Sequence, residues 1–432
     1  MEGFASGNRI LIWRSVALDG GLNIFDSTDY KNFYSDISNH FDGNCPNWGN
    51  KLWFQGLISE IDDGSNQITF RSNESLDEIN DKFDLIIYPM ANFFGVEYCR
   101  NIESIVSTFS KIKIPVYIIA CGVQAKDYNH LEWLIKEIGE EAKKFITAIY
   151  NTGGEIALRG YFSKEFFERL GFPSAQVTGC PSLYQFGRNF RVSTKKVSER
   201  DFCPVFNGKI QYYTRAIDYY KHSIHIDQDQ YFKPLFDPSF FNNDSINSMY
   251  YYYTLYGKIS AKLLSEKRIK LIADMNDWFY FLKNGSFDFA FGSRIHGTIM
   301  AVLAGIPATL LAIDTRTREM AEFFDIPYIN VSEKDDFGAE KIYDSYLDSD
   351  YSKFNDTFES KYLAYQSFLQ QHKIVSSINE KNKFFKEETA KKDFEKYIND
   401  PEKFLDYYKK LKYYTPLFEM RKMVGNLSKK FR

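Results

Sequence analysis

The chain has 432 residues, of which 44% are hydrophobic and 26% charged, and its formal net charge at pH 7 is −3. This length is enough for two hydrophobic cores, the composition is typical of soluble globular proteins, and the nearly balanced charge argues against a nucleic-acid-binding protein. The five cysteines have no CxxC spacing, and no signal-peptide pattern or membrane-spanning apolar run is present, so we expect a cytoplasmic protein.

In the first half of the chain, short β-branched runs alternate with amphipathic segments. This alternation predicts strands at 9–13, 84–88 and 116–120, and helices at 50–60, 102–111 and 131–147. The segment IALRGYFSKEFFERLGF (156–172) is typical of a strand, an arginine-containing turn and a short helix, with Ser163 as N-cap and Gly171 after its end. Strands and helices in this order predict a parallel α/β sheet.

A polar and basic stretch at 187–200 is the predicted linker to a second α/β set. That set has expected strands at 223–227, 269–273, 287–291 and 308–313, and expected helices at 249–266 and 298–304. We therefore predict two doubly wound, Rossmann-like domains that face a cleft, at 1–195 and 196–345. A helical tail with a basic end is predicted at 346–432.

The stretch FGSRIHGTIM (291–300) places an arginine and a histidine between a predicted strand and an apolar helix. Ligands of doubly wound sheets bind beyond the carboxyl ends of the strands. Arg294 can grip a phosphate or carboxylate, and His296 can give or take a proton near neutral pH. Gly297 permits close approach, and the helix that begins near Thr298 offers free N–H groups to an anion. The alternative is that the two side chains only cap neighbouring elements, but the pair in this setting favours a functional site.

Two further arginines, Arg159 and Arg316, also follow predicted strands. Arg159 could instead be a surface residue paired with Glu165 or Glu168, and Arg316 could be a solvated charge paired with Asp314. Together with the arginine and histidine of the FGSRIHG stretch, they nevertheless predict a cleft for a small polyanion.

Two polar residues of the first half could reach the same cleft. Asn50 could do so, or it could N-cap the helix that starts there, and Gln124 follows the predicted strand at 116–120. The sequence has no phosphate-loop, GxGxxG or GxSxG motif and no acidic pair in a loop after a strand, so we expect no metal.

The stretch GSRIHGTIMAVLAGIPATLLAID resembles the motif of the polysaccharide pyruvyl transferases, in which G-x-R-x-H precedes an apolar helix, G-x-P, a strand and a basic residue. IALRGYFSKEFFERLG, VTGCPSLY, VYIIACGVQ and NWGNKL are similar to other segments of that family, in the same order. The resemblance implies a GT-B-like fold with an acceptor-side first domain and a donor-side second domain. It also implies transfer of a pyruvyl group from phosphoenolpyruvate to two sugar hydroxyls, which forms a ketal and releases phosphate without a cofactor.

By this resemblance, Arg159, Arg294 and His296 hold the donor-binding and catalytic positions, and Arg316 stands where the family usually has lysine. Ketal formation requires a proton on the methylene carbon and attack by hydroxyl at C2, and a histidine beside the donor could handle that proton. The arginines would hold the phosphate as a leaving group.

Two departures from the family pattern concern Asn50 and Cys180, which stand where aspartate is usual, so residue 50 cannot supply a carboxylate general base. The expected acceptor is an intermediate of a capsule or exopolysaccharide, or a lipid-linked glycan. A nucleotide-sugar-dependent GT-B glycosyltransferase and a non-catalytic glycan- or anion-binding relative are the alternatives. The basic end at 405–432 could contact the cytoplasmic face of a membrane or pack back on the protein.

Overall fold

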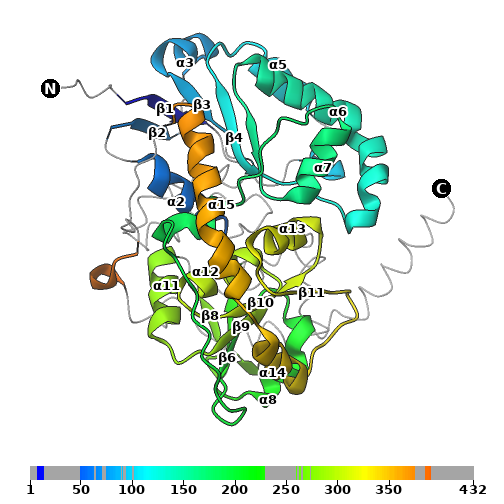
Figure 1. The fold of residues 1–432 in the computed structure, drawn as a ribbon, viewed down its shortest axis with the longest axis vertical. Helices are drawn as coiled ribbons and strands as arrows, with labels where there is room; N and C mark the ends of the chain where they lie inside the picture. The colour runs from blue at the N-terminus through cyan, green and yellow to red at the C-terminus, as the bar shows by residue number, and fades with distance from the viewer. Residues whose placement is uncertain are drawn as a thin grey trace, which may run out of the picture.

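The computed structural model describes residues 7–13, 49–62, 65–70, 74–88, 90, 94–99, 102–228, 259, 262–263, 266–272, 274–374 and 385–390. These residues build two parallel β-sheets, each flanked by helices, which lie one above the other in Figure 1. The predicted fold class, two doubly wound α/β domains, is confirmed. The basic segment 405–432 lies outside the described residues, so its membrane contact stays a prediction.

The first sheet contains β1 (Arg9–Ile12), β2 (Gln67–Phe70), β3 (Leu85–Ile87), β4 (Val116–Cys121) and β5 (Ile156–Leu158). All neighbouring strands are parallel, in the order β2-β1-β3-β4-β5. The strands β3 and β4 are buried throughout, as expected when helices cover both faces of a parallel sheet. The winding direction changes between β1 and β3, and the chain after β1 (14–48) lies outside the described residues.

The helices of this half are α2 (Asn50–Ile61), α3 (Leu76–Lys82), α4 (Val96–Cys99), α5 (Glu103–Phe109), α6 (Leu131–Asn151) and α7 (Tyr161–Arg169), with the short 3₁₀ helix η1 (Tyr128–His130) before α6. The sequence of α6 explains its packing, because Leu134, Ile138, Ala142, Phe145 and Ile149 recur at helical spacing and are all buried. These side chains form a core with the strands β4 and β5.

The second sheet contains β6 (Pro204–Asn207), β7 (Ile224–Asp227), β8 (Ile269–Leu271), β9 (Phe289–Gly292), β10 (Ala308–Ala312) and β11 (Tyr328–Asn330). All neighbours are again parallel, and the order is β11-β10-β9-β6-β7-β8. This is the Rossmann strand order, whose change of direction falls between β6 and β9. The ligand site of such a sheet is expected beyond the carboxyl ends of those two strands.

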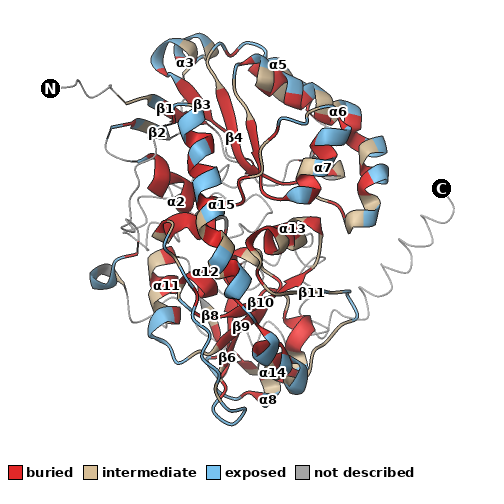
Figure 2. Cartoon of the chain, viewed as in Figure 1, coloured by how far each residue is buried: buried red, intermediate tan, exposed pale blue. Residues whose placement is uncertain are grey.

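The helices of the second half are α8 (Thr214–Tyr219), α11 (Met275–Asn284), α12 (Ile295–Leu303), α13 (Thr315–Phe324), α14 (Ala339–Asp348) and α15 (Ser352–Gln371), with the 3₁₀ segments η2 (Pro181–Phe186), η3 (Ile210–Tyr213) and η5 (Glu387–Thr389). The helix α12 is buried on all sides from His296 to Leu303, which Figure 2 shows as a red helix at the centre of the molecule. It packs on β9 and β10 and also contacts α2 and η2, and this double contact explains its continuous apolar sequence.

Two expected helix starts are wrong in detail. The helix after β9 begins at Ile295 rather than near Thr298, so Arg294 is its N-cap residue. The N-cap of α7 is Gly160, and Ser163 lies in the first helical turn instead. The stretch 188–200 joins the two sheets without regular secondary structure, as expected of a linker, and the exact domain boundaries remain predictions.

The helix α15 runs from the second half of the molecule back along the first (Figure 1). Its Tyr362 donates a hydrogen bond to Glu60 of α2 at 3.1 Å, and its Tyr365 ring stacks on Tyr184 of η2 with centroids 5.1 Å apart. Its Lys361 forms an ion pair with Asp325 at the end of α13. The helix is therefore part of the folded body. Among the described residues, no helix combines the length and apolar character needed to cross a membrane.

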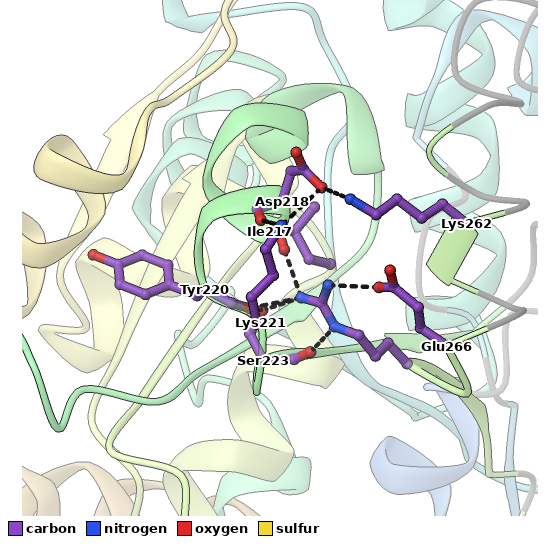
Figure 3. A network of polar contacts seen from close by, with 8 residues as sticks. Ile217, Asp218, Tyr220, Lys221, Ser223, Lys262 and Glu266 are labelled. Carbon is purple, nitrogen blue, oxygen red and sulfur yellow. Dashed lines mark hydrogen bonds and ion pairs between the residues drawn. The ribbon is translucent and has the colours of Figure 1, made fainter.

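A buried arginine, Arg268, fixes the end of α8 (Figure 3). Its guanidinium donates to the carbonyls of Ile217, Tyr220 and Ser223 at 2.5, 2.6 and 2.7 Å, and to the carboxylate of Glu266 at 3.1 Å. The carbonyls at the end of a helix have no partner within the helix, so one side chain satisfies several of them at once. The start of β8 is thereby tied to the turn before β7.

The substitution Arg268→Leu is expected to lower the free energy of unfolding by about 3 kcal/mol, because it leaves buried carbonyl groups without donors. Urea unfolding followed by circular dichroism measures this change. The matched control Arg169→Leu removes an exposed ion pair with Glu132 and should change stability by less than about 0.5 kcal/mol. Equal effects of the two substitutions would contradict the assigned role.

Candidate functional site

The GSRIHG segment lies at the change of winding direction in the second sheet. The strand β9 ends at Gly292, which pairs with Asn207 at the end of β6. Arg294 and His296 follow directly, the first as N-cap of α12 and the second within its first turn. The predicted strand-exit position is therefore the place where a doubly wound sheet binds its ligand.

The two glycines of this segment make room for one side chain. A Cβ on Gly292 or on Gly297 would lie 2.6 Å or 2.9 Å from Oδ1 of Asn207. The same Oδ1 accepts a hydrogen bond from the backbone N–H of Arg294 at 3.1 Å and so fixes the turn into α12. The space directly beside Gly297, where close approach of a ligand is expected, is lined by the side-chain amides of Gln228 and Asn207.

His296 is 6% exposed and faces Cys180, whose Sγ is 4.0 Å from Nε2. Ser182 donates a hydrogen bond to that sulfur at 3.0 Å. Burial, followed by the positive charges of Arg159 and Arg316, lowers the pKa of His296 to about 3. The imidazole is therefore uncharged at neutral pH, and burial raises the pKa of the Cys180 thiol, so that the thiol is protonated as well.

Arg159 is 3% exposed, and its guanidinium donates two hydrogen bonds to the carbonyl of Ala120, at 3.1 and 2.9 Å. Ala120 adopts a left-handed conformation with φ 61°, near a register shift in β4, which is a strained state for a residue with a side chain. A Cβ on Gly122 would lie 2.7 Å from the Arg159 side chain, so only glycine fits there. The alternative placement of Arg159 as a surface residue is wrong.

Arg316 lies in the first turn of α13 and pairs with Asp314 at 2.6 Å. Asp314 caps α13 by accepting from the N–H of Thr317 at 3.0 Å. The ion pair that the sequence offered as an alternative role is thus present. Arg316 is nevertheless close enough to His296 to lower the pKa of the imidazole.

The start of α13 is bonded to the first domain through Thr315, which donates to the carbonyl of Val123 at 2.8 Å and accepts from the N–H of Ala125 at 2.9 Å. Four residues later, the fully buried Glu319 accepts hydrogen bonds from the N–H and hydroxyl of Ser163 at 2.9 and 2.8 Å. Ser163 lies in the first turn of α7, so a carboxyl group of one domain satisfies the helix start of the other. Burial raises the pKa of Glu319 to about 8 despite the charge of Arg159 and the Ser163 hydrogen bonds, which act in the opposite direction.

The remaining predicted residues lie at the edge of this cluster. Thr298 is fully buried in the first turn of α12. Gln124 is partly buried, and its N–H donates to Phe94. Asn50 is the first residue of α2, whose N-cap is Gly49, so the capping alternative for Asn50 is wrong. The side chain of Asn50 lies outside what the structure describes.

The structure therefore brings Arg159, His296 and Arg316 together. Arg294 lies at the start of α12, the helix that contains His296. The sequence analysis did not identify Asn207, because it ends β6, a strand that was not predicted. It did not identify Glu319, because this residue resembles a surface acid of the TRTRE stretch. Within the described ranges, no three His, Cys, Asp or Glu residues gather in a way that could hold a metal ion, and a metal-free reaction stays a prediction.

The chain is a two-domain α/β protein with an uncharged histidine, close to two arginines, at the switch point of its second sheet. The sequence model of the family described as polysaccharide pyruvyl transferase matches residues 15–315. The chain belongs to the polysaccharide pyruvyl transferase family, as its motifs indicated. None of the curated protein sequences matches it.

Three solved structures that are similar to this chain are distant from it in sequence. MnaA of S. aureus in complex with UDP is 13% identical with a TM-score of 0.42, over 75% of this chain and 93% of that chain. A putative UDP-N-acetylglucosamine 2-epimerase from Listeria monocytogenes is 10% identical with a TM-score of 0.40, over 88% and 92%. The glycosyltransferase SnogD from Streptomyces nogalater is 12% identical with a TM-score of 0.31, over 82% and 88%. Likeness this distant says nothing about substrate or mechanism.

The raised pKa of Glu319 predicts a pH dependence of stability. Between its ordinary pKa of 4.5 and its folded value of about 8, the folded protein holds a proton that the unfolded chain releases. The free energy of unfolding therefore falls as pH rises through this window, by up to about 5 kcal/mol from this group. Glu319→Gln, which is always neutral and keeps the contacts to Ser163, should flatten this part of the curve.

Urea unfolding at a series of pH values between about 5 and 8 measures the slope. The control Glu322→Gln changes a half-buried acid on the same helix whose pKa is lowered, so it should leave the falling slope in place. An unchanged slope in the Glu319 variant would mean that this carboxyl group is already ionised in the folded protein.

Proposed function

We propose that this protein transfers the pyruvyl group of phosphoenolpyruvate to two hydroxyls of a glycan, with formation of a ketal and release of phosphate. One observation carries the proposal: an uncharged, buried histidine lies within the field of two guanidinium groups and in the first turn of a helix. A donor with both a carboxylate and a phosphate matches that field, because each anionic group can find positive partners.

The charge balance of the site supports an anionic donor. Arg316 forms an ion pair with Asp314. Burial raises the pKa of Glu319 to about 8, so this carboxyl group adds little negative charge to the site at neutral pH. Two guanidinium groups whose charges reach the buried histidine favour binding of an anion beside it.

His296 is placed to move the protons of the reaction. One sugar hydroxyl adds to C2 of phosphoenolpyruvate while its proton passes to the methylene carbon C3, and this transfer can run through Nε2. Phosphate then leaves C2, the second hydroxyl adds to the same carbon, and its proton leaves with the phosphate. The uncharged imidazole of the free protein can accept the hydroxyl proton, and the imidazolium so formed can donate that proton to carbon.

Donor binding is expected to change the protonation of this histidine. In the free protein, burial and two arginines oppose the charged imidazolium. A bound anion has the opposite effect on the same group, so the pKa of His296 rises when the donor occupies the site. The proton-carrying form of His296 is thus more accessible in the donor complex than in the free protein.

The acceptor side is proposed to lie toward Gln124 and the start of α2 at Asn50, on the first domain. The glycan would be an intermediate of a capsule or exopolysaccharide, or a sugar on a lipid carrier at the cytoplasmic face of the membrane. Because Asn50 is not acidic, His296 is the proposed proton acceptor for the attacking hydroxyl.

The purified full-length chain is expected to release phosphate from phosphoenolpyruvate only when a glycan acceptor is present, with a matching mass gain on the glycan. His296→Gln and Arg294→Gln should each lower the rate by about 10²- to 10⁴-fold, because one handles the proton and the other holds the donor. His222→Gln, which changes an exposed histidine, is the matched control and should keep full activity.

Two results would contradict the proposal. Turnover of nucleotide sugars but not of phosphoenolpyruvate would indicate a glycosyltransferase. Binding of anions or glycans without any turnover would indicate a binding protein.

The neighbour of the histidine offers a second test. The Sγ atom of Cys180 is 4.0 Å from Nε2 of His296, so Cys180→Asp places a carboxylate beside the imidazole and should raise the pKa of His296, whereas Cys180→Ser should leave it unchanged. Histidine C2–H resonances followed by NMR over pH report this value, and His296→Gln assigns the resonance. No rise in the aspartate variant would show that residue 180 does not set the charge of the imidazole.

A further inference from the structure

A second group of residues lies around the start of α12, next to the site described above. It comprises Asn207 at the end of β6, Gln228 directly after β7, and Gly297 with Thr298 in the first turn of α12. We refer to these four residues as the amide pocket. The strands β6 and β7 are neighbours in the sheet, so their carboxyl ends meet at the start of α12.

Gln228 is the unusual member of the amide pocket. The residue is 1% exposed, yet neither Nε2 nor Oε1 has a hydrogen-bond partner among the described residues. Nε2 lies 2.2 Å from the point that a Cβ on Gly297 would occupy, so the carboxamide rests directly against the helix start. Burial of an amide without partners is costly, and such groups in folded proteins mark a missing ligand or water.

The first turn of α12 contains further polar groups without hydrogen-bond partners within the described part of the chain. The hydroxyl of Thr298 is fully buried and has no hydrogen-bond partner within the described part of the chain. The first helical bond of α12 runs from the N–H of Thr298 to the carbonyl of Arg294 at 2.9 Å. The N–H groups of Ile295, His296 and Gly297 therefore precede the helical hydrogen bonds and lack a partner inside the helix.

Taken together, the amide pocket offers donors without formal charge. Gln228 Nε2, the Thr298 hydroxyl and the helix N–H groups can all donate to oxygen, and the helix dipole favours negative charge there. Arg159 follows β5 and Arg316 lies in the first turn of α13, and the charges of both act on His296. Gln228 follows β7, so its carboxamide comes from a different element of the fold. The site thus divides into a guanidinium part and an amide part.

We propose that the amide pocket binds the carboxylate of the donor, with Gln228 and Thr298 as specificity-determining residues. This inference rests on the proposed function. A carboxylate carries a single charge and suits neutral donors, whereas the more highly charged phosphate suits the guanidinium groups. The arrangement holds phosphoenolpyruvate in one orientation, with C2 and C3 beside His296.

The test compares binding of phosphoenolpyruvate, pyruvate and inorganic phosphate to the full-length chain by titration calorimetry. Gln228→Met keeps the size of the side chain and removes its donor, and it should weaken phosphoenolpyruvate and pyruvate by about 10-fold or more. Thr298→Val should weaken both to a smaller extent. Inorganic phosphate should bind as in the wild-type protein.

Stability separates this role from a structural one. Because Gln228 has no hydrogen-bond partner among the described residues, its methionine variant should unfold at the same or a higher urea concentration than the wild type. The control Gln366→Met removes a buried glutamine that bonds to Tyr362 at 3.0 Å, and it should lower stability without changing the affinity for pyruvate.

Three results would overturn the inference: unchanged affinity for pyruvate in the Gln228 variant, weakened binding of inorganic phosphate alone, or no binding of pyruvate by the wild type. Failure of the proposed function is a distinct outcome. If pyruvate binds in a manner that depends on Gln228 while phosphoenolpyruvate is never turned over, the carboxylate subsite stands and the transferase proposal does not.

Discussion

The contact between α13 and the first domain determines whether the site exists at all. His296 and Arg316 belong to the second sheet's helices, whereas Arg159 follows a strand of the first sheet. Thr315 exchanges hydrogen bonds with the chain beyond β4, and Glu319 supplies the acceptor for the start of α7. These bonds bring the three charged or protonatable groups into one electrostatic environment.

The chemistry of the site depends on groups kept in their uncharged forms. A carboxyl group beside an arginine would ordinarily cancel its charge, and an imidazole near a carboxylate would ordinarily be protonated more easily. In this protein, burial keeps Glu319 largely protonated and His296 neutral. The positive potential of the arginines is thereby preserved for a ligand, in a region from which water is largely excluded.

The sequence was sufficient for the architecture and for the central motif. Alternating apolar runs predict both parallel sheets, and glycines around Arg294 and His296 indicate an unusual strand-to-helix junction. The missed parts depend on contacts between segments far apart in the chain. Nothing local distinguishes Glu319 from a solvated acid, and its role requires Ser163, which lies 156 residues away.

The supporting amides of the site were equally hidden. Asn207 ends the short strand β6 and Gln228 follows the short strand β7, and only the strand order places both beside α12. The burial of Arg159 likewise depends on the left-handed backbone of Ala120, a conformation that an alanine in a strand pattern does not indicate.

The path of α15 has a consequence for the order of folding during synthesis. The ring of Tyr184 and the carboxylate of Glu60 reach their partners on α15 only after residue 365 has been made. The first domain therefore leaves the ribosome with part of its interior uncovered, and the last helix of the described body completes it. The two halves of the protein mature together, although each has its own sheet.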